Sequence, residues 1–259
     1  MPTLSTEHTA LRPFLAKLAS YVKLSDEELI LLARAVTSSR RLTPHSEVLA
    51  QGRQGSSVFI VLRGFACRFK VLSNGRRQIT SYLVPGDICD YRFLASRPTD
   101  QGTTTLSATT IGAIPLETMA SICERYPNVM KALLSAAAVD EAIGREWMIN
   151  LGQRTAVQRT AQVICELYVR LHIVGLTDRL SFNLPITQSE LGEALGLSTV
   201  HVNRTLQELR RSELITLKSG IVTILDLDRL ASLAMFDPQY LGVSSMPSPD
   251  TASAGRELH

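Results

Sequence analysis

The sequence lacks the closely spaced cysteines of a metal site. Its four cysteines lie far apart and include no Cys-x-x-Cys pair; they are Cys67, Cys89, Cys123 and Cys165. Zinc sites and iron–sulfur clusters usually draw on such local pairs. We therefore expect no metal and no cofactor, and we interpret the four cysteines as free, buried thiols.

No stretch approaches the length of apolar residues that crosses a bilayer. The first residues, MPTLSTEHTALRPF, lack the apolar core of a signal peptide. These absences predict a cytoplasmic protein with no membrane partner. At 259 residues and 45% hydrophobic content, the chain can form a core and two domains.

Catalytic motifs are also absent. The sequence has no His-Glu-x-x-His, no phosphate-binding glycine loop and no nucleophile elbow, and its five histidines are scattered. We therefore expect no enzyme. The net charge of +3 permits nucleic-acid binding but does not argue for it, so that case depends on local pattern.

Residues 186–225 contain the strongest local pattern. Thr187 and Glu190 match a capping box, which predicts that a helix begins at Gln188. Gly196, with Leu197 and Ser198, is expected to break that helix in a single tight turn.

A second helix is expected to begin at Thr199, with Ser198 as its N-cap. Leucine and valine recur at three-and-four spacing across the break, at Leu191, Leu195, Leu197, Val202, Leu206 and Leu209. Two helices packed this way, followed by a hairpin that turns at Ser219-Gly220, indicate a winged helix-turn-helix. The alternative is an ordinary helical hairpin.

The first turns of such a second helix reach base edges in the DNA major groove. Thr199, Val200 and Arg204 are the candidates for reading sequence. Arg204 can bind guanine through two hydrogen bonds, and Val200 can contact a thymine methyl group. Asn203 can read adenine or face the neighbouring backbone. The alternative for Arg204 is an ordinary solvated arginine.

Other residues of the motif are better placed for the DNA backbone. Ser198 and His201 are candidates for phosphate contacts, as is Gln188, where the free N–H groups of a helix start favour an anion. Arg210 and Arg211 lie too far along the helix for bases and are either phosphate contacts or surface charge.

Before this motif, residues 41–115 show the pattern of short strands and turns that is typical of a β domain. Asn74-Gly75 is a strong hairpin signal because both residues tolerate positive φ. Short strands with turn residues between them predict a sandwich or barrel-like roll. The expected strands are 48–50, 58–62, 65–71, 78–83 and 103–114.

Helices are expected on both sides of this β domain. A capping box at Ser25 and Glu28 predicts a helix that runs to about Ala35, and Pro13 fits the first turn of a helix over 11–21. The remaining helices are expected at 117–125, 128–151, 154–172 and 227–235, with a short strand at 180–184.

The predicted helix 128–151 has two apolar stripes and must be buried on two sides. One stripe consists of Ala132, Ala136, Val139, Ile143 and Trp147. The other consists of Met130, Leu133, Ala137, Gly144, Met148 and Leu151, and is interrupted by Glu141. We expect one stripe to cover the β domain and the other to meet a second copy of the chain. The alternative is a helix buried within one monomer.

Four segments together resemble the Crp–Fnr family of bacterial transcription regulators over about residues 11–236. They are Gly52 to Gly64, Tyr82 to Asp87, Leu151 to Arg159 and the helix-turn-helix. The resemblance implies an α+β fold with an antiparallel β-roll (jelly-roll-like) and flanking helices. The implied parts are a flexible N-terminus 1–10, a cyclic-nucleotide-binding-like sensory roll 11–126, a dimerisation helix 127–152, a winged helix-turn-helix 153–236 and a flexible tail 237–259.

For function, the resemblance implies a homodimer that binds a two-fold symmetric operator in double-stranded DNA. It also implies contact with RNA polymerase if the protein is an activator. Family members commonly bind a small effector in the roll. The resemblance places an effector pocket at Gly86, Asp87, Asp90, Tyr91, Arg92, Thr103 and Thr104.

The sequence departs from the cyclic-AMP-binding pattern of that family at two places. Tyr91 stands where a glutamate is expected for the ribose, and the segment from Asp100 to Thr104 lacks the arginine that holds the phosphate. An anionic phosphate buried without a cation is costly. We therefore predict no tight binding of cyclic AMP, although Arg92 and Arg97 could serve another acid.

Two further departures concern DNA and oxygen. Val200 stands where many members have a glutamate that accepts from cytosine, whereas Arg204 matches the guanine-reading arginine. Residues 1–30 lack the cysteine cluster of the oxygen-sensing branch. Three alternatives remain open: a redox- or metal-responsive regulator that uses its cysteines, an effector-independent regulator, and a signalling dimer that no longer binds DNA.

Overall fold

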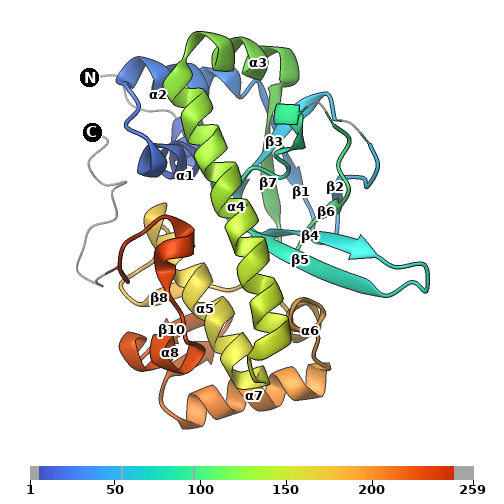
Figure 1. The fold of residues 1–259 in the computed structure, drawn as a ribbon, viewed down its shortest axis with the longest axis vertical. Helices are drawn as coiled ribbons and strands as arrows, with labels where there is room; N and C mark the ends of the chain where they lie inside the picture. Colours follow the sequence, from blue (N-terminus) through green and yellow to red (C-terminus); the bar gives the residue numbers. More distant parts are fainter. Residues whose placement is uncertain (1–5, 54, 96, 248–259) are drawn as a thin grey trace. The chain divides into compact units, whose positions relative to one another are not determined.

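The structure is a computed structural model that describes residues 6–53, 55–95 and 97–247. These residues form two compact units, one made of 6–69 and 82–138 and the other of 70–81 and 139–247. Figure 1 shows the elements of both. No helix among the described residues is long and apolar enough to cross a membrane.

The expected antiparallel roll belongs to the first unit, except for residues 70–81 of its β4–β5 hairpin, which fall in the second unit. Its strands form two sheets, with the orders β1-β7-β3 and β2-β6-β4-β5. The tip of the β4–β5 hairpin turns at Gly75, with φ of 81°, as the Asn-Gly signal predicts. The strands are β1 Ser38–Leu42, β2 Glu47–Leu49, β3 Ser57–Arg63, β4 Ala66–Val71, β5 Arg77–Leu83, β6 Gly102–Thr105 and β7 Thr109–Pro115.

Two expectations for this roll were incomplete. The polar strand β1 was missed because its side chains are largely exposed and its sequence, SSRRL, has no apolar alternation. The single strand expected at 103–114 is two strands, β6 and β7, which belong to different sheets.

Helices α1 Thr6–Tyr21 and α2 Asp26–Ala35 cover the roll. Phe14, Leu18 and Leu32 lie in the same buried cluster as Ile60 and Ile114 of the strands. The Ser25 capping box is present as predicted. The expected loose N-terminus 1–10 was partly wrong, because α1 begins at Thr6 and Pro13 lies inside it. Residues 1–5 lie outside the described residues.

Helix α3 Leu116–Arg125 is followed directly by the long helix α4 Pro127–Gln153 (Figure 1). Pro127 is thus the first residue of a new helix, where a missing N–H costs nothing. Of the two predicted stripes, the one that contains Ala132, Ala136, Ile143 and Trp147 is buried within the chain at these four residues.

The second predicted stripe of α4 is wrong at Leu133, where the neighbouring Leu134 is exposed instead, whereas Met148 is exposed at its predicted position. Leu133 is fully buried, whereas Leu134, Met148 and Ile149 are 51%, 66% and 49% exposed. Gly144 is partly exposed, and a Cβ atom added there would have open space. The helix therefore presents an apolar outer face interrupted by the Glu141–Arg145 ion pair.

The second unit holds the helix-turn-helix and its wing. Its three-stranded sheet has the order β8-β10-β9. The expected flexible tail 237–259 was partly wrong, because Pro238 and Leu241 are buried in a short 3-10 helix. Residues 248–259 of that prediction lie outside the described residues. The elements are α5 Ala156–Ile173, β8 Ser181–Asn183, α6 Gln188–Leu195, α7 Thr199–Arg211, β9 Ile215–Lys218, β10 Ile221–Ile224, α8 Leu227–Ala234 and η2 Pro238–Leu241.

Candidate DNA-binding face

Helices α6 and α7 are joined by a turn whose backbone conformation favours glycine. Gly196 has a φ of 65°, in the left-handed region that side chains disfavour. One turn earlier, a Cβ atom on Gly192 would lie 2.5 Å from the backbone oxygen of Leu197. Close approach of the two helices therefore depends on both glycines.

Both helices begin where the sequence predicted. The Thr187 hydroxyl accepts from the Glu190 N–H at 3.2 Å, and the Glu190 carboxylate accepts from the Thr187 N–H at 2.7 Å. Ser198 Oγ accepts from the His201 N–H at 3.3 Å. These caps satisfy N–H groups that have no partner inside the helix.

Helix α5 forms polar contacts with both α6 and α7. The hydroxyls of Thr160 and Thr205 lie 3.1 Å apart and join α5 to α7 in the core. Arg159 donates from Nη1 to the backbone oxygen of Leu195 at 3.0 Å, at the last turn of α6. An arginine at that position also complements the negative end of the helix dipole. The position of α7 is thus fixed by polar contacts as well as by packing.

The outward face of α7 contains the residues predicted to read DNA. Val202, Leu206 and Leu209 are buried, which turns Thr199, Val200, His201 and Arg204 outward. Val200 is 72% exposed, a high value for an apolar side chain in a capped, well-packed helix. Within the described part of the chain, the Arg204 guanidinium forms no hydrogen bond or ion pair.

Three side-chain amides form a row beside this face. Gln207 Nε2 donates to Asn203 Oδ1 at 2.8 Å, and Asn203 Nδ2 donates to Gln188 Oε1 at 3.3 Å. Asn203 is thus engaged with its neighbours in this structure, and the choice between adenine and the backbone stays open. The sequence analysis did not predict the contact of Gln207, although Gln207 stands four residues after Asn203.

The wing follows α7 as β9, a turn at Ser219 and Gly220 with positive φ, and β10. A groove of about 500 Å³ lies between the end of α7 and β9. Arg210, Arg211 and Lys218 line it. Three cations at its rim suit phosphate oxygens, which agrees with the first of the two interpretations of Arg210 and Arg211.

Replacement of Ser198 by alanine is expected to destabilise the second unit by about 1 kcal/mol, because the His201 N–H loses its acceptor at the helix start. Urea denaturation followed by circular dichroism measures this change. The matched control is Ser189→Ala, an exposed serine within α6 that should have almost no effect. Equal stabilities of the two variants would contradict the capping role.

Comparison with known proteins identifies both halves of the chain. Residues 39–126 match the model of the cyclic nucleotide-binding domain, and residues 158–233 match the Crp-like helix-turn-helix domain. The chain belongs to the Crp/Fnr family. It is a Crp/Fnr-type transcription regulator with a helix-turn-helix DNA-binding domain. Regulators of this family bind DNA and act as dimers.

Relatives of this Crp/Fnr chain include the transcriptional activator protein Anr of Pseudomonas aeruginosa, with 26% identity over 85% of this chain and 90% of Anr. AadR of Rhodopseudomonas palustris, named as a transcriptional activatory protein, shares 28% over 75% of this chain and 80% of its own length. The structure of FixK2 from Bradyrhizobium japonicum aligns with a TM-score of 0.67 and 21% identity, over 76% of this chain and 96% of FixK2.

In this Crp/Fnr roll, two of the proposed effector residues have structural partners. Asp87 accepts from the Val84 N–H at 2.7 Å and pairs with Lys17 of α1. A Cβ atom on Gly86 would lie 2.7 Å from the backbone oxygen of Pro13. This turn therefore holds α1 against the roll, a role that sequence reasoning did not foresee.

Two of the remaining effector candidates also have structural partners. Arg92 pairs with Asp100 at 3.1 Å, and Thr104 donates to the Ser46 backbone oxygen at 3.0 Å. Of the seven candidates, only Asp90 lines the neighbouring cavity of about 30 Å³. Ligand pockets usually have about 300–1,000 Å³, so this cavity has no room for a nucleotide.

The thiols of this Crp/Fnr protein are largely shielded from solvent. Cys67, Cys89 and Cys165 are buried, and Cys123 is partly buried. Burial raises the pKa of Cys89 to about 12, and burial likewise raises the pKa of Cys165. Because the thiolate is the reactive form and the metal ligand, these residues are poorly suited to the redox- or metal-responsive alternative.

Proposed function

We propose that this chain acts as a homodimer that reads a two-fold symmetric operator with helix α7. The observation that carries the proposal is the outward face of α7, where Val200 and Arg204 project from a helix fixed by its cap and by the Thr160–Thr205 contact. An exposed valine beside an arginine that has no partner among the described residues suits the edge of a base pair.

The proposed contacts follow the direction of each side chain. Arg204 binds guanine, while Thr199 and Val200 contact the neighbouring bases. Ser198 and His201, at the start of α7, and Gln188, at the start of α6, bind phosphate. Asn203 orients Gln188 through their 3.3 Å hydrogen bond or releases it to bind adenine.

The apolar outer face of α4 is the surface proposed to meet the second copy. Its exposed leucine, methionine and isoleucine suit a helix-to-helix contact, and the open space at Gly144 allows close approach. Since Anr and AadR are named as activators, contact with RNA polymerase in the bacterial cytoplasm is part of the same proposal.

Selection of sites from a random DNA library by the purified protein tests this function. We expect an inverted repeat whose half-sites lie about one helical turn apart, with guanine at one position of each half-site. Affinity for the selected site should fall steeply as salt rises. Failure to enrich any sequence, with no salt-dependent binding, would favour a signalling dimer that no longer binds DNA.

Cyclic AMP is expected to leave the melting temperature of the protein unchanged. The segment from Asp100 to Thr104 contains no arginine that could hold the phosphate, and the nearby Arg92 pairs with Asp100 at 3.1 Å. A ligand at one hundred times its Kd would stabilise the protein by about 2.7 kcal/mol. Thermal denaturation with millimolar cyclic AMP measures this, with 5′-AMP as control; a rise with cyclic AMP alone would contradict the expectation.

A further inference from the structure

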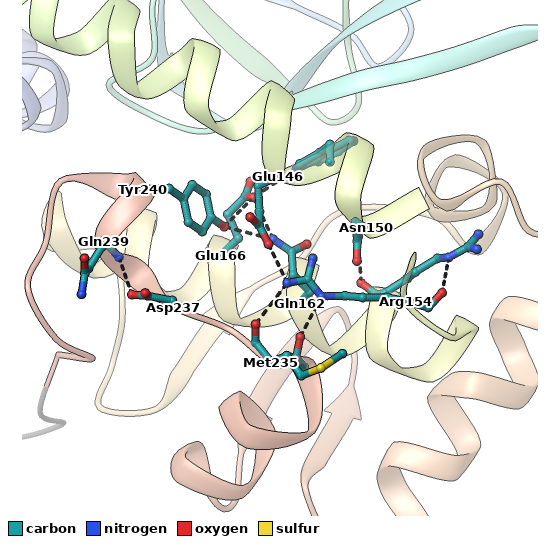
Figure 2. Close-up of polar contacts among 12 residues, drawn as sticks. Glu146, Asn150, Arg154, Gln162, Glu166, Met235, Asp237, Gln239 and Tyr240 are labelled. Carbon is teal, nitrogen blue, oxygen red and sulfur yellow. Dashed lines mark hydrogen bonds and ion pairs between the residues drawn. The ribbon is translucent and has the colours of Figure 1, made fainter. Parts of the chain in front are cut away.

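The end of α4, helix α5 and the chain after α8 are joined by buried polar contacts (Figure 2). At their centre is Glu166 of α5, whose side chain is inaccessible to solvent. Its carboxylate accepts from Trp147 Nε1 of α4 at 3.0 Å, from the Tyr240 hydroxyl of η2 at 2.9 Å and from Arg170 Nη1 at 2.9 Å. A buried carboxylate is stable only with such donors.

A second cluster lies at the junction between α4 and α5. Arg154 donates to the backbone oxygens of Ala234 and Met235 at 2.9 and 3.1 Å, and it pairs with Glu146 of α4 at 2.6 Å. Those two oxygens belong to the end of α8, where carbonyl groups have no partner within the helix. The same guanidinium thus holds the end of α8 to the end of α4.

Residues 235–241, which we term the C-terminal strap, lie between these clusters. Pro238 and Leu241 are buried, and the rings of Phe236 and Tyr240 meet edge to face at 5.8 Å. Burial, with a further contribution from Glu166, raises the pKa of Tyr240 well above its usual value. The hydroxyl therefore stays protonated and donates at neutral pH.

We propose that the C-terminal strap is a positioning element that fixes the angle between α4 and α5, and through it the spacing of the two half-sites in the operator. This inference rests on the proposed function. Helix α5 is tied to α7 by the Thr160–Thr205 contact and to α6 by Arg159. If two copies meet along α4, the α4–α5 angle sets how far apart the two α7 helices lie.

Hydrogen bonds suit this task because they depend on direction, whereas an apolar contact tolerates rotation. Trp147 and Tyr240 approach the same carboxylate from elements that are distant in sequence. Loss of either donor leaves the Glu166 carboxylate buried with fewer partners. The angle between α4 and α5 can then vary over a wider range.

The test compares operators whose half-sites have the selected spacing with operators lengthened or shortened by one base pair. In Tyr240→Phe, we expect the preference for the selected spacing to fall at least about fivefold, because the loss of a donor to the buried Glu166 carboxylate allows the angle between α4 and α5 to vary. The matched control is Tyr126→Phe, which removes a tyrosine-to-glutamate hydrogen bond of 3.0 Å in the first unit and should keep the preference.

Trp147 is the only tryptophan of the chain, so its fluorescence reports directly on the surroundings of the Glu166 carboxylate. We expect a red-shifted emission in Tyr240→Phe and an unchanged one in Tyr126→Phe. Should Tyr240→Phe fail to fold, Trp147→Phe removes the other donor and should lose the same spacing preference.

The outcomes separate the two proposals. If the unmodified protein enriches no operator, the proposed function fails and this inference falls with it. If the unmodified protein binds its operator but folded Tyr240→Phe keeps the full spacing preference, only the positioning role is overturned.

Discussion

Replacement of Arg204 by alanine is expected to lower the affinity for the selected operator by about 5- to 140-fold. This range corresponds to the roughly 1–3 kcal/mol of a bidentate arginine–guanine contact. The change should also relax the base preference at one position of each half-site and leave the others intact. Titration of labelled operators that carry each of the four base pairs at that position measures both effects.

Arg210→Ala provides the matched control, since it removes an arginine from the same helix at a point beyond the reach of bases. It should weaken binding to all sequences about equally and reduce the salt slope by about one. If Arg204→Ala behaves like Arg210→Ala, Arg204 contacts phosphate and the base assignment is wrong. If neither variant weakens binding, α7 does not face DNA.

The local pattern of the sequence predicted where α6 and α7 begin and which residues of α7 face outward. Helix starts depend on a residue and its third neighbour, and the boxes at Thr187 and Ser25 were therefore readable without the fold. The outward direction of Val200 and Arg204 follows from the spacing of the leucines around them. Whether Asn203 and Gln188 touch could not be read, because they belong to different helices.

The parts that sequence reasoning missed depend on contacts between distant segments. Periodicity assigned Trp147 to one of the two apolar stripes of α4, but nothing local pairs its indole with Glu166. The stretch after α8 contains proline, glycine and serine and resembled a flexible tail, yet Tyr240 is held by a residue 74 positions earlier. The strand β1 was missed for a related reason, since its partner β7 rather than its own polar sequence makes it a strand.

A charge on the outer face of α4 is expected to have the other large effect. Met148→Glu places a carboxylate in the contact proposed to bury this side chain, which is 66% exposed in the single chain. Substitutions at the centre of such interfaces cost about 2–4 kcal/mol, so the dimer dissociation constant should rise by about 30- to 700-fold. Sedimentation equilibrium measures the dissociation constant, and operator titration measures the loss of affinity that follows.

The control is Ile30→Glu, which adds the same charge at a similarly exposed apolar residue of α2. It should leave both the dimer and operator affinity unchanged. Operator binding should suffer in Met148→Glu because a symmetric site is bound by two α7 helices at once, and separate monomers lose the gain from linking them. If Met148→Glu stays dimeric while Ile30→Glu dissociates, the copies meet through α2, and the outer face of α4 has some other partner.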